Sequence, residues 1–184
     1  MASSAEMMKA VAVLTLMLAC ADVGYQVLLV DESCKNIANV FPAKLRELRL
    51  TFDKIKEYFQ MKDEELDILL LRDDLLQDFK GSLGCESVSE MLHFYLEEVL
   101  PKAEANDQST EVALGFLKSM LLDLKRSLKR CHRFLACEGR SKTIKQIKET
   151  YHQMQEKGIY KALGEFDIFI NYIEAYVMEK KKRQ

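Results

Sequence analysis

The chain contains few residues that interrupt helices. Its 184 residues include only 7 glycines and 2 prolines, too few for the many tight turns of a β-sandwich or β-barrel. With 48% hydrophobic and 30% charged residues, it is neither disordered nor a membrane protein in its overall composition. The net charge of −2 excludes a general binder of polyanions, although a local basic patch remains possible. The composition therefore favours a helical globular domain.

Signatures of catalysis are also missing. No His-Glu-x-x-His, glycine-rich phosphate loop or Gly-x-Ser-x-Gly occurs. The three histidines are His93, His132 and His152. Cys131, His132 and Cys137 could hold zinc, and a cysteine beside a histidine could act as a nucleophile, but cysteines of an exported chain favour disulfides. We therefore expect no catalytic site, no metal and no cofactor.

The first residues have the pattern of a secretory signal peptide. Lys9 precedes an apolar run from Ala10 to Leu18, which is too short to span a bilayer. Ala19-Cys20-Ala21 fits the small-x-small pattern of a cleavage site. This pattern predicts a signal peptide over 1–21 and one secreted domain over 22–184; the alternative is a membrane anchor.

Cysteine usage agrees with export. Cys20 leaves with the signal peptide, and an even number of cysteines remains at Cys34, Cys85, Cys131 and Cys137. In a secreted chain this predicts two disulfides. Counting alone leaves three possible connectivities open. No Asn-x-Ser/Thr sequon is present, so no N-glycan is expected.

Apolar residues recur at spacings of three and four along most of the chain, which is typical of helices that bury one face. Ser87 and Glu90 form a capping box, which predicts that the third helix begins there. The pattern predicts an all-helical bundle of about six segments, near 42–60, 66–80, 88–100, 111–131, 142–157 and 158–177.

The last predicted helix is the most apolar of the six. It must be buried on most sides, by its own chain or by a partner chain. One of its edges stays charged, with Lys161, Glu165, Asp167 and Glu174. A polar stripe also follows the first helix, at Arg46, Arg49, Asp53, Lys56 and Gln60. Both could be solvated faces; the functional interpretation is a docking surface, because arginine suits paired hydrogen bonds to carboxylates.

The end of the fourth predicted helix is strongly basic, with Lys125, Arg126, Lys129, Arg130 and Arg133. Cations at this position complement the negative end of the helix dipole. The sharper hypothesis is a binding site for sulfated glycans or other acidic partners.

Four stretches of the sequence carry a family resemblance. They are Phe59-Gln-Met-Lys-Asp63; Asp78-Phe-Lys-Gly-Ser-Leu-Gly-Cys85 with Phe94-Tyr-Leu-Glu-Glu-Val99; Cys131-His-Arg-Phe-Leu-Ala-Cys137; and Gln155-Glu-Lys-Gly-Ile-Tyr-Lys161 followed by Glu165-Phe-Asp-Ile-Phe-Ile-Asn-Tyr-Ile-Glu-Ala-Tyr176. With these motifs the chain resembles the interleukin-10 family of class II helical cytokines over nearly its whole mature length.

The resemblance implies a fold and an assembly. The fold would be a six-helix cytokine bundle that forms an intertwined, domain-swapped homodimer, with the last two helices (about 141–180) packed into the partner's bundle. The disulfides would join Cys34 to Cys131 and Cys85 to Cys137.

The resemblance also implies a function. A high-affinity receptor chain would bind, an accessory receptor chain would join it, and kinase-linked signalling would suppress inflammation. The matching receptor-binding positions are Arg46, Arg49, Lys56, Gln60, Asp63, Asp67, Lys161, Glu165, Asp167 and Glu174. The alternative is a secreted helical binding protein that carries glycans or another ligand without signalling.

Overall fold

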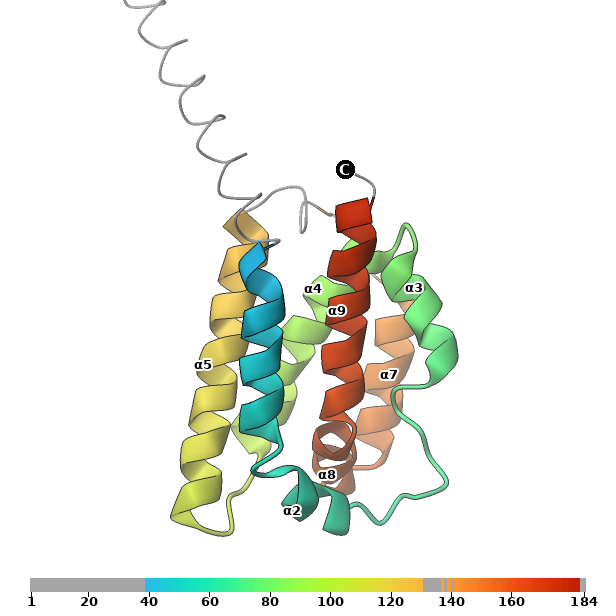
Figure 1. The fold of residues 1–184 in the computed structure, drawn as a ribbon. Helices are drawn as coiled ribbons and strands as arrows, with labels where there is room; N and C mark the ends of the chain where they lie inside the picture. Colours follow the sequence, from blue (N-terminus) through green and yellow to red (C-terminus); the bar gives the residue numbers. More distant parts are fainter. Residues whose placement is uncertain (1–38, 131–136, 138, 140, 183–184) are drawn as a thin grey trace, which may run out of the picture.

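The computed structural model describes residues 39–130, 137, 139 and 141–182, and within them the chain folds into helices (Figure 1). The predicted signal peptide over 1–21 and Cys34 lie outside these residues. The first described helix covers 39–52. It is followed by α2 (Lys56–Met61), η1 (Asp73–Leu75), α3 (Leu76–Lys80), α4 (Gly84–Phe94), η2 (Tyr95–Val99), η3 (Leu100–Lys102), α5 (Gln108–Arg130), α7 (Lys142–Gln153), α8 (Lys157–Gly164) and α9 (Phe166–Lys182).

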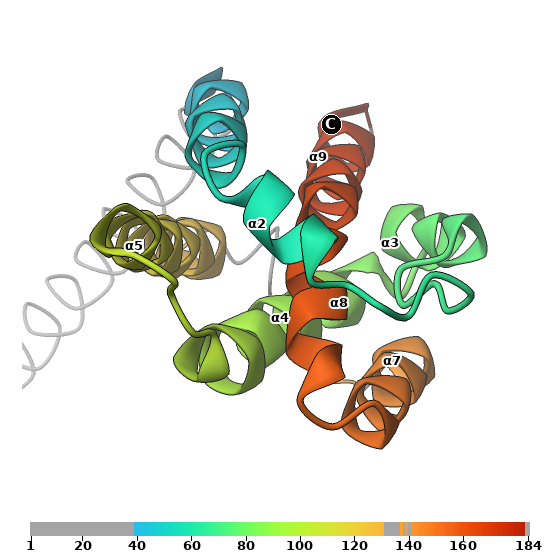
Figure 2. The ribbon, with the colours of Figure 1, turned by 90° about the horizontal axis from the view of Figure 1, so that it is seen from below.

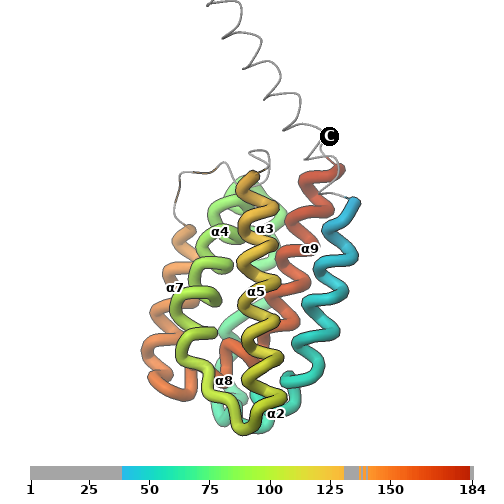
Figure 3. The backbone as a smooth tube through the Cα atoms, turned by 90° about the vertical axis from the view of Figure 1, so that its left-hand side faces the viewer, coloured from blue at the N-terminus to red at the C-terminus, as the bar shows by residue number. Residues whose placement is uncertain are grey.

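Helices α4 and α9 occupy the centre of the bundle. Helix α4 contacts α3, α5, α7 and α9, and α9 also packs on α3. The helix over 39–52 runs beside α5 on one flank, as the ribbon and the tube both show (Figures 1 and 3). At one end of the bundle the short α2 packs across α8 (Figure 2). Segments from both halves of the sequence therefore build one core.

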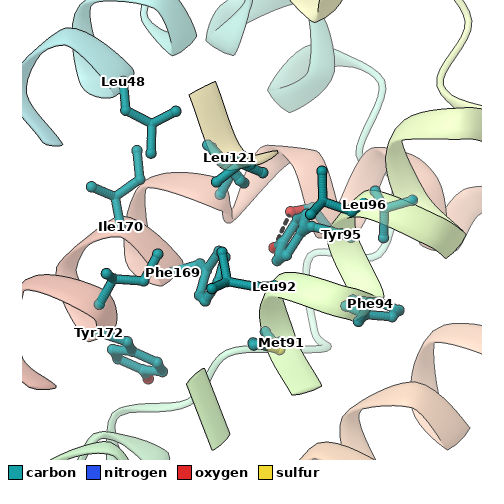
Figure 4. Close-up of a cluster of buried hydrophobic side chains, with 14 of the residues drawn as sticks. Leu48, Met91, Leu92, Phe94, Tyr95, Leu96, Leu121, Phe169, Ile170 and Tyr172 are labelled. Atoms are coloured by element: carbon teal, nitrogen blue, oxygen red, sulfur yellow. Dashed lines mark hydrogen bonds between the residues drawn. The ribbon is translucent and has the colours of Figure 1, made fainter. Parts of the chain in front are cut away.

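Large aromatic side chains fill this core. Tyr95 stacks on Phe169 with ring centroids 4.9 Å apart, and its hydroxyl donates to the Ala162 carbonyl at 2.8 Å (Figure 4). Phe166 meets the edge of the Tyr95 ring at 5.0 Å. Each buried aromatic of this kind contributes about 1.5–3 kcal/mol through the area removed from water. The polar hydroxyl is satisfied, so its burial costs little.

The predicted apolar stripe of the last segment is buried throughout, at Leu163, Phe166, Ile170, Ile173 and Val177. In this structure the covering elements belong to the same chain. The spacing of three and four thus identified the buried face correctly. The continuous helix predicted over 158–177 is wrong, however, because the chain bends at Glu165, between α8 and α9.

Two further helix predictions are corrected. The segment over 66–80 is helical only near its end, from Asp73, and Leu66 is 80% exposed. The capping box at Ser87 does not begin a helix, because α4 already starts at Gly84 and Ser87 is buried inside it. A methyl group on Gly84 would lie 2.2 Å from the Phe79 carbonyl oxygen, so only glycine permits this tight corner between α3 and α4.

A disulfide joins the start of α4 to the chain that leads into α7. It links Cys85 to Cys137, with Cα atoms 5.8 Å apart, as the family resemblance implies. The other implied pair, Cys34 and Cys131, lies outside the described residues. Across the helices that the structure describes, none is both long and apolar enough to cross a membrane.

Candidate functional site

Two charged edges meet along one side of the bundle. The first belongs to the helix over 39–52 and α2, and the second to α8 and α9. Arg49 places its guanidinium 2.6 Å from the Glu174 carboxylate and 2.9 Å from the Asn171 amide oxygen. Seven residues further on, at the start of α2, Lys56 lies 2.5 Å from Asp167. We call this surface the paired strip. Its four charged side chains are all half-buried, so solvent still reaches them.

The strip continues towards the end of the bundle. Gln60 donates its side-chain amide to the Gly164 carbonyl at 3.1 Å, where α8 ends. Arg46 and Asp67 are both exposed, and neither has a hydrogen-bond or ion-pair partner in the part of the chain that the structure describes. Arg46 therefore adds an unpaired cation about one helical turn before Arg49, and Asp67 adds an unpaired anion in the loop after α2.

A buried ion cluster lies beside the strip. Lys161 lies 2.7 Å from Asp63 and 3.5 Å from Glu165. Lys161 and Glu165 are only 3% and 7% exposed. Three of the predicted receptor-binding residues are thus turned inwards. A charge buried without a partner is very costly, so each member depends on the others.

Glu165 binds the loop that follows α2. Its carboxylate accepts the backbone N–H groups of Leu71 at 2.7 Å and Leu70 at 3.3 Å. Burial raises the pKa of this carboxyl, while the two N–H groups and Lys161 oppose the rise. The carboxylate replaces the helical carbonyls that these N–H groups would otherwise need, which explains why Leu70 and Leu71 do not continue a helix.

Three side chains along α8 and at its end hold the loop that follows α2, each at a different place. Lys157, Lys161 and Glu165 are spaced by four, so they share one helix face. Lys157 reaches Glu64 and Glu65, both at 3.1 Å. Lys157 and Asn171 are not among the site residues predicted from the sequence. The spacing of four on α8 could have suggested the row, but its partners could not be identified from local sequence.

The basic end of α5 lies apart from the paired strip. Lys129 and Arg130 occupy its last turn and are exposed, as is Arg126, whereas Lys125 is half-buried. Arg133 and His132 lie outside the described residues. Among the residues that are described, no group of three or more His, Cys, Asp or Glu side chains is placed to hold a metal ion.

The geometry of the strip and the cluster suits binding between proteins, since its charges are held in place by neighbours on facing helices. Comparison with known proteins gives the family. The model of the family described as Interleukin 10 matches residues 9–179. The chain belongs to the interleukin-10 family. It is accordingly a cytokine and not an enzyme.

Relatives from birds and mammals are similar over most of their length. Interleukin-10 of Gallus gallus is 55% identical over 153 residues, which cover 83% of this chain and 87% of the relative. Interleukin-10 of Felis catus is 52% identical over 158 residues, covering 86% and 88%. The chain is therefore a homologue of interleukin-10 over nearly the whole of that protein.

A solved structure supports the fold independently. The crystal structure of human interleukin-19 superposes with a TM-score of 0.60, covering 71% of this chain and 86% of interleukin-19. At 19% sequence identity, this likeness concerns the fold alone. It agrees with the all-helical cytokine bundle that the sequence predicts.

Proposed function

We propose that this interleukin-10 homologue is a secreted, domain-swapped homodimer that binds a high-affinity receptor chain through the paired strip. The observation that carries the proposal is the meeting of Arg49 with Glu174 and of Lys56 with Asp167. Residues from both ends of the sequence thus form one charged surface. Such surfaces raise association rates and set specificity.

The strip and the buried cluster have different parts in this proposal. Arg46, Arg49, Lys56, Gln60, Asp67, Asp167 and Glu174 are at least partly open to solvent and would contact the receptor. Asp63, Lys161 and Glu165 are largely enclosed, so they would act mainly by holding the neighbouring loop in position. Receptor groups would have to compete with the existing ion pairs, which favours partners with matching charges.

A charge reversal tests this surface. In the double variant Arg46→Glu with Arg49→Glu, binding to the ectodomain of the high-affinity interleukin-10 receptor should weaken about 100-fold or more, because two cations become anions beside Glu174. Lys118→Glu with Lys145→Glu is the matched control, since both lysines are exposed on other faces. Circular dichroism should show unchanged helix content. Equal receptor affinity in the parent and the first variant would reject the strip as the contact surface.

The accessory receptor chain would bind on the other side of the helix over 39–52, where that helix meets α5. A groove of about 340 Å³ opens there beside Phe116, which is 61% exposed. Val112, in the same groove, is 51% exposed, and neighbouring exposed apolar side chains of this kind can mark a protein contact. Phe116→Ser should therefore weaken recruitment of the accessory chain while leaving the high-affinity chain bound, as surface plasmon resonance can measure. Unchanged recruitment would remove this flank from the proposal.

Support for the homodimer comes from the contacts between the C-terminal helices and the helices that precede α5. Helices α7, α8 and α9 follow the long α5 and make their contacts with α2, α3 and α4. In the described structure these contacts are made within one chain. A second chain can make the same contacts, and a short connector that resists folding back favours this exchange. Light scattering should give twice the mass of the mature chain.

A longer connector should release a monomer. Inserting about six flexible residues beside Gly139 should let α7–α9 dock on their own chain, because lengthening a hinge removes the reason for exchange. The controls are the parent protein and a variant with a two-residue insertion at the same place. Six glycine or serine substitutions at exposed positions of α9 are not a suitable control, because they would disrupt that helix. If the six-residue variant still elutes wholly as a dimer, the proposed role of the connector is wrong.

Secretion rests on the predicted signal peptide over 1–21. Mass spectrometry of protein from the culture medium of expressing cells should find an N-terminus at Asp22. Protein retained in the cells with its first residues intact would contradict the prediction.

The second candidate function is glycan binding without signalling. The observation in its favour is the basic end of α5, where Lys129 and Arg130 are exposed beside Lys125 and Arg126. Cells that carry both receptor chains decide between the two functions. Kinase-dependent phosphorylation on addition of the protein supports the cytokine, whereas heparin binding without any such response supports the carrier.

A further inference from the structure

The methionines of the described chain differ widely in their access to solvent. Met91 is fully buried in the core (Figure 4). Met120 and Met154 are half-buried and pack against that core. Met61 and Met178, by contrast, are 73% and 50% exposed. Because an oxidant must reach the sulfur atom, Met61 and Met178 are the two methionines of the described residues that are most open to oxidation.

Both exposed methionines lie at the ends of the paired strip. Met178 follows Glu174 by four residues on α9, so it lies on the same helix face, one turn further on. Glu174 is the partner of Arg49 in the strip. Met61 is the last residue of α2 and directly follows Gln60, whose side-chain amide donates to the end of α8. The two thioethers therefore flank the charges of the strip.

A thioether and a sulfoxide present different surfaces to a protein partner. The thioether is apolar, polarizable and flexible, so it packs well against an irregular surface. Oxidation turns it into a polar group whose oxygen accepts hydrogen bonds from water. Burying that oxygen without a donor costs free energy. Oxidation at the ends of the strip would therefore oppose the approach of a receptor, while the ion pairs within the strip stay in place.

We propose that Met61 and Met178 are oxidation sites through which hydrogen peroxide weakens receptor binding. The proposal rests on the proposed function, because it takes the paired strip as the receptor contact. The sulfur lone pair attacks one oxygen of the peroxide, and the O–O bond breaks as the S=O bond forms. A proton passes to the departing hydroxide, which leaves as water. The thioether loses two electrons and the peroxide gains them. Methionine sulfoxide reductases reverse the change.

Peptide mass spectrometry after limited peroxide treatment of the mature protein tests the two sites without any receptor. Met61 and Met178 should become sulfoxides at least about fivefold faster than Met120 and Met154, and Met91 should stay unmodified. Circular dichroism and thermal melting of the same samples establish that the protein remains folded. Equal rates at the exposed and the half-buried methionines would overturn the assignment.

A receptor titration tests the consequence of oxidation. Peroxide treatment should weaken binding of the parent to the ectodomain of the high-affinity receptor chain about fivefold, and sulfoxide reductases should restore it. In Met61→Leu with Met178→Leu, the affinities before and after peroxide should agree within about 1.5-fold, because no exposed thioether remains at the strip. Met120→Leu is the matched control, since Met120 lines a groove on the flank of α5. This control should respond to peroxide as the parent does.

The remaining outcomes separate this proposal from the proposed function. Unchanged affinity in the oxidised parent rejects the oxidation sites, and so does an equal loss in the double leucine variant. The paired strip survives either result if Arg46→Glu with Arg49→Glu still weakens binding. A sulfoxide-dependent loss in a protein whose charge reversal has no effect retains the oxidation sites but rejects the strip as the surface that they flank.

Discussion

The ammonium of Lys161 lies 2.7 Å from the carboxylate of Asp63, and both groups are almost closed to solvent. The two residues are far apart in sequence and belong to different elements, α8 and the loop after α2. Their contact fixes the loop to the helix at one point. Glu165 lies 3.5 Å from Lys161, and its carboxylate accepts the N–H groups of Leu70 and Leu71, which ties the same helix to the far end of the loop.

Removing Lys161 should be strongly destabilising. In Lys161→Met the carboxylates of Asp63 and Glu165 remain buried without their cation, and breaking a buried pair costs about 3–5 kcal/mol. Urea unfolding at a fixed protein concentration measures the loss. Asp63→Leu added to Lys161→Met should recover part of it, because one stranded charge is removed. A double variant less stable than both single variants would contradict this coupling.

Exchanging the charges of the paired strip should separate stability from recognition. Arg49→Glu alone places two carboxylates together and should cost up to about 1 kcal/mol, since the pair is partly exposed. Arg49→Glu with Glu174→Arg restores the pair and should restore stability, yet binding to the high-affinity receptor should remain weak. The matched control is the exchange of Lys44 with Asp123, an ion pair on the flank of α5. Full receptor affinity in the Arg49 and Glu174 exchange would mean that the strip acts only within the cytokine.

Two glycines should respond to alanine in opposite directions. Gly84→Ala places a methyl group against the Phe79 carbonyl and 2.8 Å from the Tyr176 ring, so the variant should lose more than about 2 kcal/mol. Gly115→Ala meets nothing within 4 Å inside α5 and should gain about 0.5–1 kcal/mol from helix propensity. Chemical denaturation provides both values. Similar effects at the two positions would contradict the packing at the α3–α4 corner.

Glu165 should make stability depend on pH in an identifiable direction. Burial raises the pKa of its carboxyl above the ordinary value, so the folded chain holds the proton more firmly than the unfolded chain does. The stability contributed by this group is present below the unfolded pKa and is lost as the pH rises through the folded pKa. Free energies of unfolding between about pH 4 and pH 7 should show this decline in the parent and a smaller one in Glu165→Gln. Identical profiles would contradict the assignment.

The buried faces of the helices could be predicted because they depend on local spacing. Phe166, Ile170 and Ile173 lie in the core as their intervals of three and four require. The break at Glu165 and the loop around Leu70 could not be predicted in this way, because both depend on hydrogen bonds between distant segments. Leu66 and Leu69 contributed to the wrong prediction of a helix over 66–80. Both are exposed, but their spacing is the same as that of a buried apolar stripe.

The candidate site was anticipated only in part. Charge and spacing identified Arg49, Lys56, Asp167 and Glu174, and the structure brings them together in pairs. Charge and spacing also predicted that Lys161 and Glu165 lie on an exposed edge, although both side chains are buried. Sequence cannot distinguish a solvated charge from one that a distant loop covers, because the covering residues are specified elsewhere in the chain.

The row of Lys157, Lys161 and Glu165 on α8 has a consequence for how the protein can be monitored. These three side chains tie the stretch from Asp63 to Leu71 to the bundle, so this stretch keeps its shape only while α8 is docked. Cleavage by a protease within this stretch, for example near Leu66, would therefore detect the separation of α8 from the bundle. The rate of cleavage would then report how often the C-terminal helices leave their place, long before the whole chain unfolds.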